Sequence, residues 1–220
     1  MLVKACGARV AADIEACEEA GVDLVGFNFV PSSKRFISVT SAADLRSGLR
    51  NAAAVGVFMD QSIAEVRDAV VAVGLDFVQL HGSERPELWS AAEVGAPLIK
   101  AMTYEQAADA DLVQRWAARC RWLLIDGRAP GSGKTWDVSA LRLRDGTLGG
   151  VGVLLAGGLS PDNVAAAVAA CRPVGVDSAS GVELLSGPNA GMRMDPVRVS
   201  KFLTEARRVV MAADASGGAR

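Results

Sequence analysis

The sequence predicts a single (β/α)8 barrel, and three observations carry this prediction. Apolar runs of strand length alternate with stretches of helical length about eight times along the 220 residues. No linker, composition break or tandem repeat interrupts the alternation. Alternation of this kind implies parallel strands with right-handed crossovers, and eight units at this length match a small barrel. We expect one barrel domain over residues 1–212 and a frayed polar tail over 213–220. An open doubly wound sheet, usually of about five or six strands, is the alternative.

The strands are predicted from short apolar runs bounded by glycine, proline or polar residues. They occupy residues 2–5, 24–29, 53–59, 77–80, 97–102, 122–125, 151–156 and 174–177. The run at 151–156 is apolar or glycine throughout, which is typical of a strand buried on both faces. This pattern favours a parallel sheet covered by helices.

Helical stretches separate these runs, and capping residues set their expected limits. The predicted helices are 10–20, 40–50, 62–73, 84–94, 107–118, 160–171 and 195–210. Thr40 and Ser83 are suitable N-caps for the second and fourth of these helices. Ser160 is the expected N-cap of the sixth, with Pro161 at its first helical position.

The stretch VGVLLAGGLS, residues 151–160, suggests a ligand class. A buried strand ends at Gly157 and Gly158, and a helix is expected to begin directly after them. Unpaired backbone N–H groups then face outward at the positive end of a helix dipole, which binds phosphate well. The segments LHGSE (80–84) and SGVE (180–183) look like strand-end sites of the same kind. We therefore expect a phosphorylated small molecule as ligand.

Charge and composition argue against several other classes of protein. The net charge is −2 with interspersed signs, so there is no basic stripe for nucleic acid. Aromatic residues make up only 5%, which argues against base-stacking platforms. No apolar run approaches membrane-spanning length, and residues 1–10 are too short and too charged for a signal peptide. We expect a cytoplasmic protein and, from the ordinary amphipathicity of its helices, a monomer.

Cysteine usage points to one reactive thiol. The four cysteines form no CxxC pair, so neither a zinc site nor a disulfide framework is indicated. Cys17, Cys120 and Cys171 fall within or at the ends of predicted helices and are interpreted as structural. Cys6 directly follows the first strand, and Lys4 points to the same face of that strand. A nearby ammonium favours the thiolate, although a buried inert thiol is the ordinary alternative.

Catalytic side chains of barrels lie at the C-terminal ends of the strands. Polar residues at those ends are Lys4, Cys6, Asn28, Asp60, His81, Lys100, Asp126, Asp177 and Ser180. Asp126 is a candidate proton donor, with a solvated turn aspartate as the alternative. His81, the only histidine, is expected in a supporting role, packed beneath the site. Arg35 is a candidate for a bidentate grip on a carboxylate or phosphate, with simple solvation as the alternative.

The segment GSGKT, residues 131–135, resembles the end of a P-loop but does not complete it. The full pattern requires a glycine where Arg128 stands, and Trp136 follows where a helix would have to begin. An ATPase is therefore excluded. A flexible loop that covers a substrate is the preferred interpretation of this segment, with a disordered surface loop as the alternative.

Taken together, these segments resemble the phosphoribosylanthranilate isomerase family of tryptophan biosynthesis. The matching stretches are KACG (4–7), GFNF (26–29) with Arg35 and Phe36, VGVF (55–58), VQLHGSE (78–84), LLIDG (123–127), GSGKTWD (131–137), LLAGGLSPDNV (154–164) and GVDSASGVE (175–183). Each is weak alone, but they occur in the family's order over nearly the whole chain. The resemblance implies a (β/α)8 barrel that converts N-(5-phosphoribosyl)anthranilate by an Amadori rearrangement.

The resemblance also implies roles for individual residues. Cys6 would be the general base and Asp126 the general acid, because the reaction needs one deprotonated and one protonated group on opposite sides of the sugar. Arg35 would hold the anthranilate carboxylate. The remaining expected substrate-binding residues are Gly157, Gly158, Ser180 and Gly181 at the phosphate, together with His81 and Asp177. No metal or organic cofactor is implied.

Some positions depart from the family pattern. Ala8 and Arg9 follow the first Cys-Gly, Lys34 replaces a proline before Arg35, and the final loop, 184–194, is several residues longer. Two other functions stay open. One is a related barrel isomerase acting on the aminoimidazole ribonucleotide of histidine synthesis, but such enzymes place an aspartate where this chain has Cys6. The other is a phosphate-ligand-binding barrel without turnover, which would need no matched acid and base.

Overall fold

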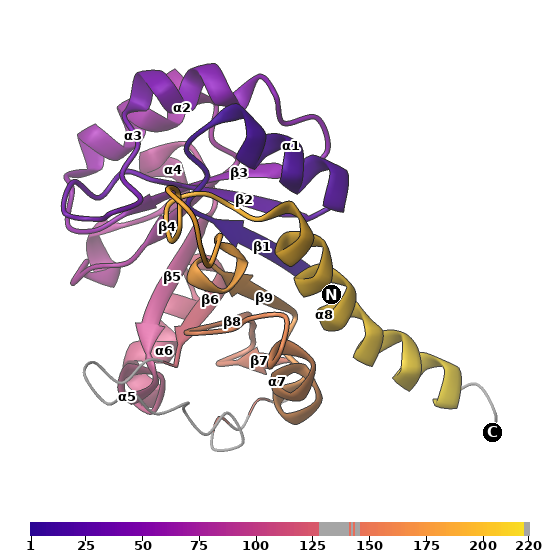
Figure 1. Cartoon of the computed structure of the whole chain (residues 1–220). Coiled ribbons are helices and arrows are strands. Elements are labelled where there is room, and N and C mark those ends of the chain that lie inside the picture. Colours follow the sequence, from indigo (N-terminus) through magenta and orange to yellow (C-terminus); the bar gives the residue numbers. More distant parts are fainter. Residues whose placement is uncertain (128–140, 142, 144–145, 218–220) are drawn as a thin grey trace.

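The computed structural model describes residues 1–127, 141, 143 and 146–217, and the structural statements below concern these residues. Its centre is a closed barrel of eight parallel strands, surrounded by helices (Figure 1). The strands are β1 (Leu2–Cys6), β2 (Leu24–Asn28), β3 (Ala53–Phe58), β4 (Phe77–Leu80), β5 (Leu98–Thr103), β6 (Cys120–Asp126), β8 (Val151–Ala156) and β9 (Gly175–Ser178). Each lies within two residues of its predicted limits. Strand β6 pairs with β8 and closes the ring, which confirms the predicted barrel and excludes the open sheet.

The helices form the outer layer. They are α1 (Ala11–Ala20), α2 (Val39–Arg46), α3 (Ile63–Val73), α4 (Ala91–Val94), α5 (Tyr104–Ala107), α6 (Ala110–Ala117), α7 (Val164–Cys171) and α8 (Pro196–Gly217), with 3-10 turns η1 (Pro86–Leu88) and η3 (Ser180–Val182). Helix α8 packs against α1 and α7. A short strand that the sequence did not predict, β7 (Thr147–Leu148), pairs antiparallel with β8.

Two apolar layers result from the alternation of side chains along each strand. Inward-facing residues such as Leu24, Val55 and Leu154 fill the barrel, and outward-facing ones such as Val25 and Phe27 pack beneath the helices. The barrel interior is apolar toward the N-terminal ends of the strands. Polar inward positions occur toward the C-terminal ends, so the pleat of each strand decides which side chains reach the mouth.

Three predicted N-cap residues, Thr40, Ser83 and Ser160, do not cap a helix. Helix α2 is capped by Ser38, whose Oγ accepts a hydrogen bond from the Ser41 N–H at 3.1 Å, and not by Thr40. Ser83 caps no helix, because its N–H and hydroxyl both donate to Asp60. The predicted helix over 84–94 is therefore divided into η1 and α4, and α4 is capped by Ser90.

The third wrong start concerns the segment after β8. Helix α7 begins at Val164 with Asn163 as its N-cap residue, three residues later than the predicted cap at Ser160. The Asn163 side chain accepts from the Ser160 N–H at 2.8 Å and donates to the Gly158 carbonyl at 3.1 Å. These bonds hold residues 158–163 in a turn, so the glycines and the helix are separated by this turn.

Two further differences concern helix limits. The predicted helix over 107–118 is two helices, since the Asp109 carboxylate accepts from two backbone N–H groups at the start of α6. Helix α8 continues to Gly217, beyond its expected end near residue 210 and into the segment predicted as a tail. Among the helices described, none combines the length and the apolar character that crossing a bilayer needs. The predicted covering loop at 131–137 lies outside the described residues.

Candidate active site

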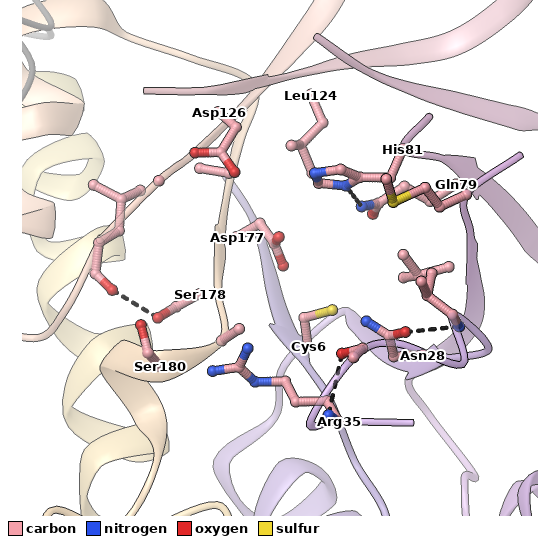
Figure 2. A pocket seen from close by; sticks show the side chains of 18 of the residues that line it. Cys6, Asn28, Arg35, Gln79, His81, Leu124, Asp126, Asp177, Ser178 and Ser180 are labelled. Carbon is pink, nitrogen blue, oxygen red and sulfur yellow. Dashed lines mark hydrogen bonds between the residues drawn. The ribbon is translucent and has the colours of Figure 1, made fainter. Parts of the chain in front are cut away.

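A cavity of about 320 Å³ opens at the C-terminal ends of the strands (Figure 2). It brings together most of the residues that the sequence singled out, from six different strands or the loops after them. The predicted site residues that line it are Cys6, Arg35, His81, Asp126, Gly157, Gly158, Asp177 and Ser180. Gly181 is the one predicted site residue outside this lining, and it follows Ser180 in the sequence.

Cys6 is the last residue of β1 and points into the barrel because inward positions on this strand are 2, 4 and 6. Its Cα partner on β2 is Gly26. A Cβ at Gly26 would lie 2.7 Å from the Cys6 Sγ and 3.2 Å from the Lys4 Nζ. The missing side chain of Gly26 therefore provides the space in which the thiol and the ammonium meet.

Lys4 and Asp177 form a buried ion pair directly below the thiol. The Nζ–Oδ1 distance is 2.9 Å, and the Lys4 side chain is fully buried. Burial alone would lower the pKa of Lys4, but the negative charge of Asp177 and the proximity of Cys6 raise it. Burial raises the pKa of the Cys6 thiol, and the Lys4 ammonium opposes this shift only in part. The net shift is upward, so the Lys4 ammonium does not outweigh burial, contrary to the expectation that it would favour the thiolate.

Asp126 ends β6, whose neighbours in the barrel are β5 and β8. Strands β8 and β9 separate it from β1, so Asp126 and Cys6 face the cavity from different sides (Figure 2). Asp126 is partly exposed. A proton donor and a proton acceptor placed in this way can act on two atoms of one small molecule between them.

His81 lies at the end of β4, in contact with a residue that the sequence analysis missed. The Gln79 amide Nε2 lies 3.3 Å from the His81 Nδ1, within hydrogen-bond distance, and the direction of this bond follows the tautomer of the ring. His81 is exposed at the cavity, so the expectation that it is packed beneath the site is wrong. Partial desolvation of its ring lowers the pKa of His81. The buried Oε1 of Gln79 has no hydrogen-bond partner within the described part of the chain, and Gln79 lines the cavity. The sequence signal that could have identified Gln79 is its position two residues before His81.

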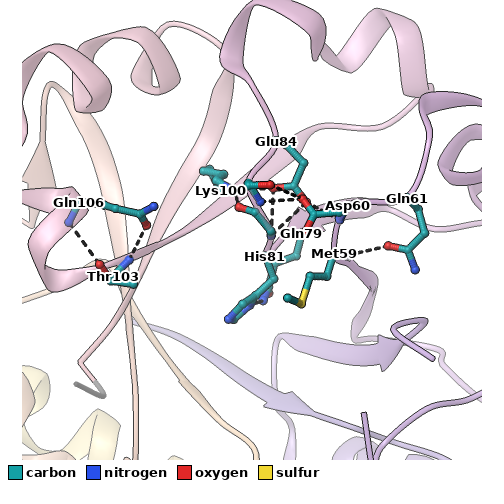
Figure 3. A network of polar contacts seen from close by, with 11 residues as sticks. Met59, Asp60, Gln61, Gln79, His81, Glu84, Lys100, Thr103 and Gln106 are labelled. Atoms are coloured by element: carbon teal, nitrogen blue, oxygen red, sulfur yellow. Dashed lines mark hydrogen bonds and ion pairs between the residues drawn. The ribbon is translucent and has the colours of Figure 1, made fainter. Parts of the chain in front are cut away.

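A polar network supports this strand end from outside the barrel (Figure 3). The Lys100 ammonium donates to the Gly82 carbonyl at 2.7 Å and to Glu84. Glu84 accepts from the Asp60 and Gly82 N–H groups, at 3.1 and 3.0 Å. Asp60 has a φ of 63° and packs against Gly82. A Cβ at Gly82 would collide with the Asp60 carboxylate. The network fixes the loops after β3 and β4 to each other.

Arg35 reaches the cavity from the loop after β2. Gly7, with a φ of +102°, leaves room for it, since a Cβ at Gly7 would lie 2.6 Å from the Arg35 Cδ. The Arg35 Nε donates to the Glu183 carboxylate at 2.6 Å. Sequence analysis noted the SGVE segment but did not connect Glu183 to Arg35, and no local signal links residues this far apart.

Two glycine-containing loops, one after β8 and one after β9, lie side by side at the mouth. Gly157 and Gly158 have φ values of 95° and 75°, which favour glycine. The Ser178 hydroxyl donates to the Leu159 carbonyl at 2.7 Å, and a Cβ at Gly181 would collide with that same carbonyl. The two loops after β8 and β9 therefore meet backbone to backbone, which suits the binding of an anion by N–H groups.

Comparison with known proteins gives a consistent result. The family model described as N-(5'phosphoribosyl)anthranilate (PRA) isomerase matches residues 3–212. N-(5'-phosphoribosyl)anthranilate isomerase of Myxococcus xanthus is 43% identical over 191 residues, covering 84% of this chain and 88% of the relative. The enzyme of Rhodospirillum rubrum is 37% identical over 94% of this chain and 97% of its own.

Solved structures agree with these relatives. The crystal structure of phosphoribosyl anthranilate isomerase from Thermotoga maritima superposes with a TM-score of 0.82 at 31% identity, covering 94% of this chain and 99% of that one. A second crystal structure, of the isomerase in complex with reduced 1-(o-carboxyphenylamino)-1-deoxyribulose 5-phosphate, gives a TM-score of 0.77 at 30% identity, with the same coverage. With nearly full-length matches in both sequence and structure, this chain belongs to the N-(5'-phosphoribosyl)anthranilate isomerase family.

Proposed function

We propose that this chain converts N-(5-phosphoribosyl)anthranilate to 1-(2-carboxyphenylamino)-1-deoxyribulose 5-phosphate, in the tryptophan pathway, with Cys6 as general base and Asp126 as general acid. The observation that carries the assignment of roles is the placement of these two groups on different sides of one cavity, with the Lys4 ammonium beside the thiol. Family membership supplies the reaction. We further propose that the protein acts in the cytoplasm as a monomer.

The reaction begins with a proton from Asp126. Its carboxyl group protonates the ring oxygen of the ribose, the bond from C1′ to that oxygen breaks, and the anthranilate nitrogen forms an iminium with C1′. The Cys6 thiolate then removes the proton from C2′, and the electron pair moves to give an enolamine. Tautomerisation of the enolamine yields the ketone at C2′. The bond changes stay within the substrate and only protons are exchanged with the protein, so an acid and a base of complementary protonation are sufficient.

The remaining residues bind and orient the substrate. Gly157, Gly158, Ser180 and Gly181 lie on the two adjacent loops that would take the phosphate, and Arg35 would take the anthranilate carboxylate. His81 and Asp177 complete the site: the His81 ring would lie against the substrate, and Asp177 accepts a hydrogen bond from Lys4.

The test is turnover of freshly prepared phosphoribosylanthranilate, followed by loss of anthranilate fluorescence. We expect wild-type activity and a loss of about 100-fold to 10,000-fold in kcat for both Cys6→Ala and Asp126→Asn. Binding without conversion by the wild type would refute the isomerase and leave a phosphate-ligand-binding barrel. Activity retained in either variant would refute the role assigned to that residue.

A further inference from the structure

Glu183, which follows η3, is a buried carboxylate shared by two cations. The Arg35 Nε lies 2.6 Å from its Oε1, and the Lys34 Nζ lies 3.5 Å from its Oε2. Glu183 is 6% exposed, whereas the Lys34 side chain is 59% exposed. The contact with Arg35 is therefore the close and buried one. A carboxylate in this position determines the orientation of the Arg35 guanidinium.

The backbone around Glu183 is fixed by the final loop, residues 184–194. Glu183 and Met194 form an antiparallel bridge, and the Leu184 N–H donates to the Arg193 carbonyl at 2.9 Å. Asp13 of α1, which is fully buried, accepts from the Met194 N–H at 3.0 Å and from the Arg193 Nε at 3.2 Å. The loop is thus closed on itself and attached to the barrel, so the backbone of Glu183 is held in place.

Arg35 is held from its other sides as well. Its stem lies against Gly7, where a Cβ would collide with it. The Arg9 Nη1 donates to the Lys34 carbonyl at 2.8 Å, and its Nη2 donates to the Met192 carbonyl. Arg9, Lys34 and the longer final loop are positions at which the sequence departs from the family pattern, and here they contact one another around Arg35. These departures therefore form one connected support.

We infer that Glu183 is a positioning residue that directs Arg35 toward the anthranilate carboxylate of the substrate. A guanidinium has five N–H donors, and Glu183 occupies the one on Nε. The edge formed by Nη1 and Nη2 is then left to take a carboxylate with two parallel hydrogen bonds. The inference rests on the carboxylate-binding role proposed above for Arg35.

The test separates the two ends of the substrate. For wild type, Glu183→Gln and Glu183→Ala, we would measure KM and kcat, the Kd of reduced 1-(o-carboxyphenylamino)-1-deoxyribulose 5-phosphate, and the Ki of inorganic phosphate. We expect Glu183→Ala to raise KM and this Kd about 10-fold to 100-fold, with kcat changed by less than about threefold. Glu183→Gln keeps an acceptor for the Arg35 Nε, so its KM and Kd should lie between those of wild type and Glu183→Ala. The Ki of phosphate should stay within about twofold of wild type in both variants.

Lys34→Met is the matched control, because it removes a charge from the same carboxylate at an exposed position and should leave KM within about threefold of wild type. A KM and Kd unchanged in both Glu183 variants would overturn the inference. So would a parallel rise in the Ki of phosphate, which would show that Glu183 instead supports the loop of η3. If Glu183→Ala does not fold, the intermediate result expected for Glu183→Gln decides. A wild type without turnover would refute the proposed function, while the Kd comparison would still test Glu183.

Discussion

Replacing Gly26 by alanine tests whether the space between β1 and β2 is what places the Cys6 thiol. The new Cβ would lie 2.7 Å from the Cys6 Sγ, 3.1 Å from the Cys6 Cα and 3.2 Å from the Lys4 Nζ. Ordinary van der Waals contact begins near 3.4 Å, so the sulfur must move by about 0.7 Å. Because the Cα of Cys6 is also too close, rotation of the side chain alone does not relieve the contact.

The expected result is a large loss of activity with a moderate loss of stability. Overpacking of a well-packed interior costs about 1–3 kcal/mol of the free energy of unfolding. Displacement of a reacting group by close to 1 Å lowers the rate by about 100-fold. The assay is kcat from loss of anthranilate fluorescence, measured well below the unfolding midpoint, together with urea unfolding of the same samples.

Gly152→Ala is the matched control at the other end of the barrel. Its Cβ would lie 2.9 Å from a Val174 methyl group and 3.2 Å from the Trp122 ring, so it overpacks the interior to a similar degree away from the site. It should lose comparable stability while kcat stays within about threefold of wild type. Equal loss of kcat in both variants, or an unchanged kcat in Gly26→Ala, would refute the reasoning.

Three further predictions concern charge. Lys100→Met leaves the buried Glu84 carboxylate without its counter-ion and should cost about 3–5 kcal/mol in urea unfolding. Lys201→Met breaks an exposed ion pair and should cost less than about 1 kcal/mol. Desolvation lowers the pKa of His81 below its ordinary 6.5, so the unfolded state binds more protons below that pH. The free energy of unfolding should therefore decrease as the pH is lowered from about 7.5 to about 5.5, and His81→Asn should reduce this decrease. Burial raises the pKa of Cys6 above 9.0, so its alkylation by iodoacetamide should still accelerate with pH beyond 9, and a plateau near pH 8 would contradict this shift.

Sequence alone could predict the barrel because its strands are apolar, short and regularly spaced. It could also place Cys6 and Asp126 at the mouth, since both end an apolar strand. Helix starts were less predictable: Ser38 and Thr40 are both capping residues, and only the fold decides which of them meets a free N–H. The pairing of Arg35 with Glu183 joins residues 148 positions apart, and such a contact exists only after the barrel has closed.

The network of Lys100, Glu84 and Asp60 limits how this scaffold can be re-engineered (Figure 3). Barrel loops are often treated as modules that can be exchanged one at a time. Here Asp60 belongs to the loop after β3 and binds Ser83 in the next loop, while the ammonium that anchors Glu84 comes from β5. A transplanted loop at either position would lack its partners unless both loops and Lys100 were moved together. Diversification of this side of the mouth therefore requires coordinated changes in three consecutive βα units.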